Sequence, residues 1–280
     1  MRMNLYDQTS FAISKQVTKK YSTSFYHATQ MLSRKSRMAI HAVYGFVRLA
    51  DEIVDTFHDA NQAKLLDVFE SDLHEALADG ISLNPILHSF ALVVSEYKIP
   101  MHLIDSFLLS MKQDLHKHSY DNEKDLDEYI YGSADVVGLM CLHIFVNGGN
   151  DLFDTLEKYA QKLGSAFQKV NFLRDLQNDI GFLERRYFYN FSLETFNDEK
   201  KQDIITDIQS DFKEARKGIH FLPGRSKLAV YIAYIYYMQL VKKIQKTPSH
   251  VLLQQRIRVS DTRKVFLFFR AWLLYIFRLI

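Results

Sequence analysis

The sequence has few of the residues that crosslink, kink or break a chain. Among 280 residues it contains one cysteine, Cys141, four prolines, ten glycines and one tryptophan. A single cysteine excludes an internal disulfide and is typical of a protein from a reducing compartment. So few prolines and glycines leave few tight turns and no recognisable linker. We therefore expect residues 1–280 to form a single domain.

Strong charge of either sign is also lacking. The formal net charge is +2, which gives no basic footprint for nucleic acid, so we expect no nucleic-acid partner. Residues 1–10 contain no apolar core segment, and no signal peptide is predicted. No glycine-rich loop follows a strand pattern, so a nucleotide-binding fingerprint is missing. These absences favour a cytoplasmic protein.

Helical periodicity is what the sequence has in abundance. Hydrophobic residues make up 48% of the chain, enough for a sizeable core, and they recur at helical spacing with almost no strand alternation. The pattern predicts an all-α fold. The predicted helices are Lys35–His58, Asn61–Asp79, Asn84–Tyr97, His102–His116, Tyr129–Asn147, Leu152–Asn178, Glu199–Ile219, Arg225–Gln245 and Asp261–Ile280.

The first predicted helix carries one polar stripe on an otherwise apolar surface. At about 100° per residue, its stripe residues fall within roughly ±40° of one line. A helix that is apolar nearly all round is buried, so the charges on this stripe need a partner. The stripe residues are Arg37, Tyr44, Arg48, Asp51 and Asp55.

A second stripe follows the segment "QKVNFLRDLQNDIGF", residues 168–182. Arg174 lies about 100° around the helix from Asp175, so it must bend toward the stripe or serve a neighbouring helix. The residues that share this stripe, again within roughly ±40°, are Gly164, Gln168, Asn171, Asp175 and Asp179.

Acids four residues apart point their side chains the same way. Two such helices facing each other would gather four carboxylates, whose mutual repulsion divalent cations relieve. Hard Mg²⁺ prefers oxygen ligands and takes one or two protein carboxylates together with substrate phosphate. Arginines complete a site for a diphosphate. The alternative is structural, because Arg48 can form salt bridges with Asp51 or Asp55 within its own helix.

These segments resemble the squalene/phytoene synthases, the head-to-head prenyltransferases. The resemblance covers most of the chain, looks closest to the bacterial phytoene synthases, and departs from the family in two places. Glu52 replaces a common second aspartate, and Arg185 and Arg186 stand where an Arg-Gly-Arg sequence is common. The matching blocks are "YSTSFYHATQMLSRKSRMAIHAVYGFVRLADEIVD", "YIYGSADVVGLM", "YAQKLGSAFQKVNFLRDLQND" and "ERRYFY".

The resemblance implies an isoprenoid-synthase-type helical bundle around a central cavity, and roles for individual residues. It implies Mg²⁺ or Mn²⁺ held by Asp51, Asp55, Asn171, Asp175 and Asp179. It places the same four aspartates, with Tyr44 and Arg48, in catalysis. The substrate-binding residues it implies are Ser22, Ser24, Phe25, Tyr26, Arg37, Arg48, Gln168, Asn171, Arg174 and, by context, Tyr237. Asp114 matches a family acid, or else is simply a charge near a helix end.

The implied reaction joins two geranylgeranyl diphosphates, through a cyclopropylcarbinyl diphosphate, to phytoene. NADPH is not expected. One alternative is the sister reaction on farnesyl diphosphate, which gives dehydrosqualene, or squalene with NADPH. Another is an inactive member that acts as a membrane-associated scaffold, but the intact aspartate pairs argue against it. The residues give no indication of the oligomeric state.

The C-terminal segment Val265–Ile280, "VFLFFRAWLLYIFRLI", raises a membrane question. It is shorter than the roughly 20 apolar residues of a typical span, and Arg270 and Arg278 interrupt it. It is either the last core helix of the domain or an interfacial helix at a membrane surface. The second reading predicts peripheral association with the inner face of the cell membrane.

Overall fold

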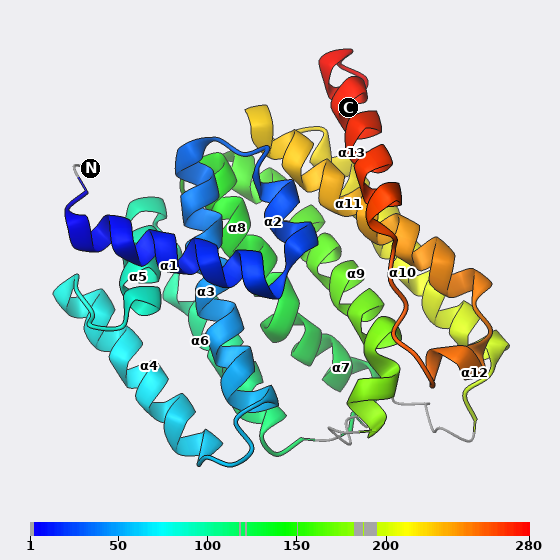
Figure 1. Ribbon diagram of the computed structural model, residues 1–280, viewed down its shortest axis with the longest axis horizontal. Helices are drawn as coiled ribbons and strands as arrows, with labels where there is room; N and C mark the ends of the chain where they lie inside the picture. Colours follow the sequence, from blue (N-terminus) through cyan, green and yellow to red (C-terminus); the bar gives the residue numbers. More distant parts are fainter. Residues whose placement is uncertain (1–2, 118, 121, 150, 182–186, 188–194) are drawn as a thin grey trace.

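A computed structural model describes residues 3–117, 119–120, 122–149, 151–181, 187 and 195–280, without the side chains of residues 178–181. The described part is all-α and has no strand, which confirms the predicted fold class. The helices form a bundle in which α1 to α8 make one side and α9 to α13 the other (Figure 1).

The helices follow one another with short connections. A turn of π-helix, η1, joins α7 to α8 without a break, so that residues 123–146 are helical throughout. In chain order the elements are α1 (Leu5–Tyr21), α2 (Thr23–Thr29), α3 (Arg34–Asp55), α4 (Gln62–Asp79), α5 (Pro85–Tyr97), α6 (Met101–Asp114), α7 (Glu123–Ile130), η1 (Tyr131–Asp135), α8 (Val136–Val146), α9 (Asp151–Gly181), α10 (Asp198–Ile219), α11 (Gly224–Lys246), α12 (Ser249–Leu252) and α13 (Asp261–Ile276).

Two large apolar clusters hold the bundle together. The first joins α3, α4, α5, α6 and α8 around Phe46, which is fully buried and stacks on Phe90 with ring centroids 4.0 Å apart. The second joins α9, α10 and α11 around Phe212 and Ile232. Helix α3 packs in the first cluster and helix α9 mainly in the second. Their polar stripes therefore face the space between the two halves of the bundle.

The stretch Glu123–Val146 is long and apolar enough to cross a membrane, judged by length and composition alone. In the structure 61% of its apolar window is buried. A core helix of a globular bundle has the same properties, and here Leu139 and Met140 lie in the first cluster.

Four predicted boundaries were wrong, and three helices were not predicted. The helix expected at Tyr129 begins at Glu123, because Asn122 caps it by accepting from the Asp125 N–H at 3.0 Å. The last helix ends at Ile276, before Ile280. The helix expected to end at His58 ends at Asp55. The long helix expected to end at Asn178 continues to Gly181. Helices α1, α2 and α12 were missed.

Gly164 of α9 lies against η1. A Cβ added there would come within 2.9 Å of the Ala134 carbonyl oxygen and of the Asp135 Cα. This approach sets the distance between the helix that carries the second stripe and the helix that follows η1. Glycine is therefore required here for packing.

We expect Gly164→Ala to lower the melting temperature by several degrees. The backbone contact must open, which costs about 1–3 kcal/mol and outweighs the roughly 1 kcal/mol that alanine gains in helix propensity. Thermal unfolding followed by circular dichroism measures the change. Gly149→Ala is the control, because its Cβ would lie 3.5 Å from His143, an ordinary contact. Equal melting temperatures for the two variants would contradict the packing argument.

Asp135 of η1 is a buried acid whose ionisation is costly. Its Oδ1 and Oδ2 accept from the Ser165 hydroxyl at 2.8 and 3.0 Å. Burial raises its pKa to about 7, although the Ser165 hydrogen bond and Lys162 act in the opposite direction. Between its usual pKa of 3.8 and about 7, the folded protein therefore binds a proton that the unfolded chain releases. This group's contribution to stability falls as the pH rises through that window.

Asp135→Asn should therefore flatten the pH dependence of stability. Between pH 5 and pH 8 we expect the melting temperature of the unchanged protein to fall by at least about 4 °C more than that of the variant, at about 2–4 °C per kcal/mol. Differential scanning calorimetry at both pH values measures it. Asp127→Asn, an exposed acid on α7, is the control. Parallel curves for all three proteins would disprove the assignment.

Candidate active site

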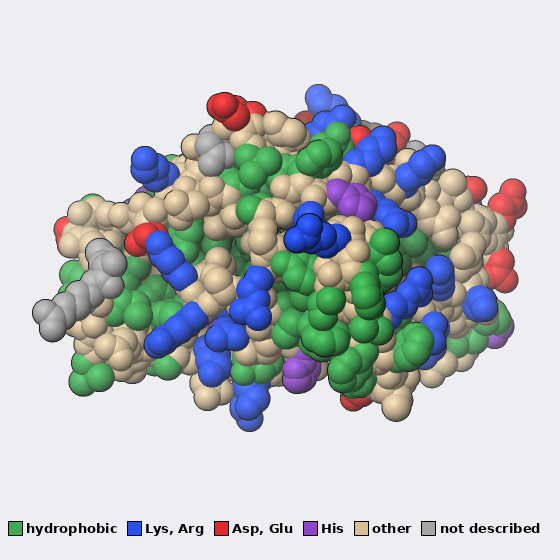
Figure 2. Space-filling model, turned by 90° about the horizontal axis from the view of Figure 1, so that it is seen from above, with side chains coloured by type: hydrophobic (Ala, Val, Ile, Leu, Met, Phe, Trp, Pro, Cys, Tyr) green, Lys and Arg blue, Asp and Glu red, His purple; other side chains and the backbone are tan. Residues whose placement is uncertain are grey.

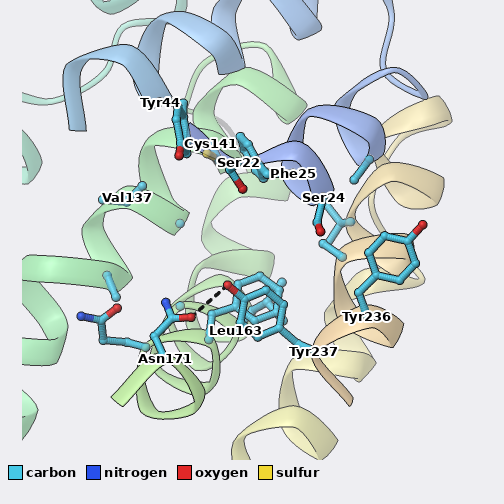
Figure 3. A pocket seen from close by; sticks show the side chains of 18 of the residues that line it. Ser22, Ser24, Phe25, Tyr44, Val137, Cys141, Leu163, Asn171, Tyr236 and Tyr237 are labelled. Carbon is cyan, nitrogen blue, oxygen red and sulfur yellow. Dashed lines mark hydrogen bonds between the residues drawn. The ribbon is translucent and has the colours of Figure 1, made fainter. Parts of the chain in front are cut away.

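A cavity of about 1130 Å³ lies between the two halves of the bundle. Its walls come from α2, α3, α8, α9 and α11, with the segment that precedes α13. Figure 3 shows Tyr44 and Phe25 on one side of this space and Asn171 and Tyr237 on the other. Segments far apart in the sequence therefore meet around one volume.

On the α3 side, Asp51 and Asp55 line the cavity together with Asp114 from the end of α6. The Asp51 side chain is 31% exposed, toward the cavity. Desolvation, and after it the neighbouring Asp55 carboxylate, raise the pKa of Asp51 to about 7, with a smaller contribution from Asp114. Asp114 is 5% exposed and accepts from the Tyr129 hydroxyl at 2.9 Å. This end of the cavity thus has an excess of negative charge.

On the α9 side, Asp175 lines the cavity between two arginines. Arg174 bends back toward it and donates from Nη2 to Asp175 Oδ2 at 2.6 Å. Arg256, from the segment before α13, lies with Nε 2.6 Å from Asp175 Oδ1. Both guanidinium groups line the cavity and would be available to a diphosphate. The side chain of Asp179, the last residue of the stripe, lies outside the described part of the chain.

One and two turns before Asp175, Asn171 and Gln168 also line the cavity. The Tyr237 hydroxyl donates to Asn171 Oδ1 at 3.2 Å (Figure 3). The Tyr237 ring stacks on Phe167, with centroids 4.0 Å apart. This contact fixes the amide, so that its oxygen faces a phenol and not bulk water.

Across the cavity, Ser22 and Ser24 of the α1–α2 corner point inward beside Phe25 (Figure 3). The Phe25 ring stacks on Tyr44 at a centroid distance of 5.2 Å. Burial, and to a lesser extent the charge of Asp51, raise the pKa of Tyr44 to about 12. Tyr44 therefore stays a neutral phenol, able to donate a hydrogen bond or to place its ring beside a cation.

Three predicted residues do not line the cavity. Tyr26 stacks on His41, with centroids 5.7 Å apart. Arg37 donates to Gln30 Oε1 at 3.2 Å. Arg48 forms an ion pair with Glu52 and lies over the Tyr21 ring at 4.6 Å.

Arg48 nonetheless influences the site through charge, because its Nη1 is 3.9 Å from Asp51 Oδ2. The other predicted residues with described side chains are brought together in the cavity wall: Ser22, Ser24, Phe25, Tyr44, Asp51, Asp55, Gln168, Asn171, Arg174, Asp175 and Tyr237. Their individual roles stay predictions.

Sequence reasoning missed Arg256 and Arg258, which line the cavity from the segment before α13. Neither lies on a helical stripe, so periodicity could not find them; the only signal was the basic run "RIR". Asp114, which the sequence left between two readings, belongs to the cavity wall. Arg185 and Arg186 lie outside the described residues.

The chemistry of the cavity suits divalent metal ions. Carboxylate and amide oxygens line it from both α3 and α9, and the raised pKa of Asp51 marks a charge that the protein alone leaves poorly compensated. In the described part of the chain, no three acidic, histidine or cysteine side chains lie close enough to hold one ion. Mg²⁺ that binds one or two carboxylates and takes its other ligands from phosphate and water fits this arrangement.

Away from the acids the cavity becomes apolar. Leu142, Phe145, Leu156 and Leu222 line its far end and pack in one small cluster. Leu156 and Asp175 lie on the same helix nineteen residues apart, about 28 Å at about 1.5 Å per residue. A ligand with a charged head and a long hydrocarbon tail would place the head beside the polar residues and the tail along the apolar wall.

The sequence model of squalene/phytoene synthase matches residues 18–189, which include both aspartate stripes. The chain belongs to the squalene/phytoene synthase family. As a member of this family it is a prenyltransferase, and its reaction is the head-to-head condensation of prenyl diphosphates. The family in general uses a divalent metal with its diphosphate substrates.

Two curated relatives differ in their products. The 15-cis-phytoene synthase of Synechocystis sp. is 27% identical over 297 residues, which cover 95% of this chain and 85% of the relative. The 4,4'-diapophytoene synthase of Staphylococcus haemolyticus is 28% identical over 197 residues, which cover 69% of this chain and 68% of the relative. The two identities are nearly equal, so they do not distinguish a C20 from a C15 substrate.

Two solved structures of other proteins have the same fold as this chain. A dehydrosqualene synthase with bound ligand superposes with a TM-score of 0.82 at 24% identity, covering 95% of this chain and 96% of the other. A squalene synthase of Alicyclobacillus acidocaldarius gives a TM-score of 0.76 at 19% identity, covering 91% of this chain and 98% of the other. The all-α fold of this chain is thus shared with these solved structures.

Proposed function

We propose that this enzyme joins two geranylgeranyl diphosphates head to head to give 15-cis-phytoene. The observation that carries the proposal is a single cavity with acids and arginines at one end and about 28 Å of α9 leading to an apolar end. Such a wall suits a long C20 tail. The 15-cis-phytoene synthase of Synechocystis, whose alignment covers 95% of this chain, supports the same product.

The reaction proceeds in two ionisations. The C–O bond of the first substrate breaks and releases diphosphate, leaving an allylic cation. The double bond of the second substrate attacks this cation, and loss of a proton closes a cyclopropylcarbinyl diphosphate. This intermediate loses its own diphosphate, rearranges and releases a second proton to give the symmetrical triene. No reductant is consumed, so NADPH is not required.

The residues of the cavity have distinct parts in this scheme. Arg174 and Arg256 hold diphosphate oxygens, as paired guanidinium groups do. Tyr44 and Phe25 present ring faces beside the cation. The apolar walls toward Leu156 exclude water, which would otherwise quench the cation to an alcohol.

Mg²⁺ is the metal we assign to the site; ions bound there would take one or two carboxylates each from Asp51 and Asp55 on α3, or from Asp175 and Asp179 with Asn171 on α9, and complete their coordination with phosphate and water. When bound it supplies Lewis-acid neutralisation of the departing diphosphate. The chain contributes carboxylates that are costly to leave uncompensated, Asp51 above all. Mn²⁺ fits the same oxygen donors.

The second candidate is the same condensation on farnesyl diphosphate. It is favoured by the diapophytoene synthase relative and by the dehydrosqualene synthase fold. A competition assay separates the two candidates: equal concentrations of C15 and C20 diphosphates are supplied with Mg²⁺, and hydrocarbons are identified by mass spectrometry. We expect the C40 triene to predominate without NADPH. Predominance of a C30 product would reassign the substrate, and a need for NADPH would reassign the product.

A further inference from the structure

Helix α13 is apolar on its exposed face as well as on its buried face. Leu267 and Ala271 are buried against the bundle, where α13 packs on α11. The opposite face is apolar and exposed, with Phe269 at 56% and Phe277 at 69%. Figure 1 shows the helix projecting beyond the rest of the bundle. The exposed apolar side chains, which we call the α13 face, are Val265, Phe266, Phe269, Trp272, Leu273, Ile276, Phe277 and Leu279.

The α13 face is continuous. Its members up to Ile276 recur at the spacing of a helix surface, and Phe277 and Leu279 follow just after the helix ends. The space-filling view shows a patch of apolar side chains on this face of the molecule (Figure 2). A helix that only completes a core would turn these side chains inward. Contiguous exposed patches of this kind mark interaction sites.

Charge around the face distinguishes among partners. After Asp261 the chain contains no Asp or Glu, whereas Arg263, Arg270 and Arg278 fall within or beside the helix. Arg263 lies 5.3 Å from the Phe266 ring. Lys and Arg side chains stand at the margins of the patch, and Asp and Glu are sparse there (Figure 2). A partner with an apolar interior and an anionic surface is complementary.

The α13 face is also joined to the cavity. Residues 256–261 and Lys264 line the cavity wall. The Tyr236 hydroxyl, from the α11 wall, donates to the Lys264 carbonyl oxygen at 3.0 Å. The first turn of α13 is therefore part of the site, and its exposed face continues outward from it.

We propose that the α13 face docks on an anionic lipid bilayer, with α13 lying in the interface beside the cavity. Its 16 residues are fewer than a span requires, and its aromatic and aliphatic bulk with flanking arginines is the composition of an interfacial helix. Given the proposed function, the apolar substrate and product exchange between this bilayer and the cavity.

Trp272 provides a direct test, because it is the only tryptophan in the sequence and lies on the α13 face. The full-length protein is mixed with vesicles of phosphatidylcholine alone or with phosphatidylglycerol. We expect a blue shift of Trp272 emission and cosedimentation with the anionic vesicles, both weakened by high salt. Emission unchanged by anionic vesicles would overturn the proposal.

Matched variants locate the binding surface. Phe266→Glu with Phe269→Glu should reduce vesicle binding at least about tenfold. Leu83→Glu with Leu109→Glu, which changes two leucines that are at least as exposed but lie elsewhere on the surface, should leave it unchanged. Equal binding by both pairs would overturn the assignment, as would a lipid-free dimer that already buries Trp272 in sedimentation velocity. Activity on detergent-dispersed substrate, retained by the Phe266/Phe269 pair, separates this proposal from the proposed function.

Discussion

Asp51→Asn and Asp175→Asn should each reduce kcat about 10³-fold with Mg²⁺ and prenyl diphosphate. The two acids line opposite sides of the cavity. In the proposed reaction both would hold metal ions that neutralise the departing diphosphate. Losing one carboxylate ligand at this point costs about 4 kcal/mol of transition-state stabilisation, and each 1.4 kcal/mol or so is a factor of ten. Diphosphate release in single-turnover experiments measures the effect.

Stability separates this role from a structural one. The Asp51 carboxylate is costly in the metal-free protein, because desolvation and Asp55 oppose its charge. Asp51→Asn should therefore melt at or above the temperature of the unchanged protein without Mg²⁺. Asp175→Asn should melt lower, because it leaves Arg174 and Arg256 unpaired. Asp72→Asn, an exposed acid on α4, is the control for both measurements. A loss of activity proportional to a loss of folded protein would argue against catalysis.

Ala160→Phe should change which substrate is accepted. Ala160 lines the cavity from α9, fifteen residues before Asp175, which is about 22 Å along the helix. A phenyl ring there shortens the apolar end, which only the longer tail must reach. We expect kcat/KM for the C20 diphosphate to fall at least about tenfold, the equivalent of about 1.4 kcal/mol, while that for the C15 diphosphate changes little.

The ratio of the two kcat/KM values within one variant is its own control for folding. Phe90→Leu, in the first cluster and away from the cavity wall, adds an external control for general loss of core packing. An equal fall for both substrates would mean that the tails do not run along α9 toward Leu156. A fall for the C15 substrate alone would reverse the direction that we assign to the cavity.

The stripes were predictable because they place polar residues on helices that are otherwise apolar. Asp51, Asp55, Asn171 and Asp175 are costly groups at helical spacing on largely apolar helices, and such groups need a common partner. The structure brings these four to one cavity. The all-α fold was predictable for the related reason that apolar periodicity is strong over most of the chain.

Helix α1 was not predictable by that route. Its buried face consists of Asp7, Ser10, Ser14 and Thr18, small polar residues that carry no apolar period. Two of them have partners far along the chain, because the Ser14 hydroxyl lies 2.8 Å from that of Ser89 and Asp7 Oδ1 lies 2.9 Å from His88 Nε2. Nothing in the sequence near residue 14 reveals a partner 75 positions away.

Arginine positions were predicted least well. Helical geometry fixes the direction in which a side chain leaves the backbone, but the guanidinium group of an arginine, at the end of a long flexible side chain, can reach several sites. Arg48 turns to Glu52 and Tyr21, Arg174 turns back to Asp175, and Arg256 arrives from an irregular segment. Which arginine faces a diphosphate is thus decided by tertiary packing, after the stripes have placed the acids.

The fate of the first allylic cation shows whether the cavity holds two prenyl chains at once. The purified protein is incubated with Mg²⁺ and geranylgeranyl diphosphate alone, and the products are extracted and identified by mass spectrometry. We expect a hydrocarbon of twice the chain length, with two diphosphates released for each molecule formed. Diphosphate released together with a single-chain alcohol would contradict it, because the cavity would then ionise a substrate without holding a second one to capture the cation.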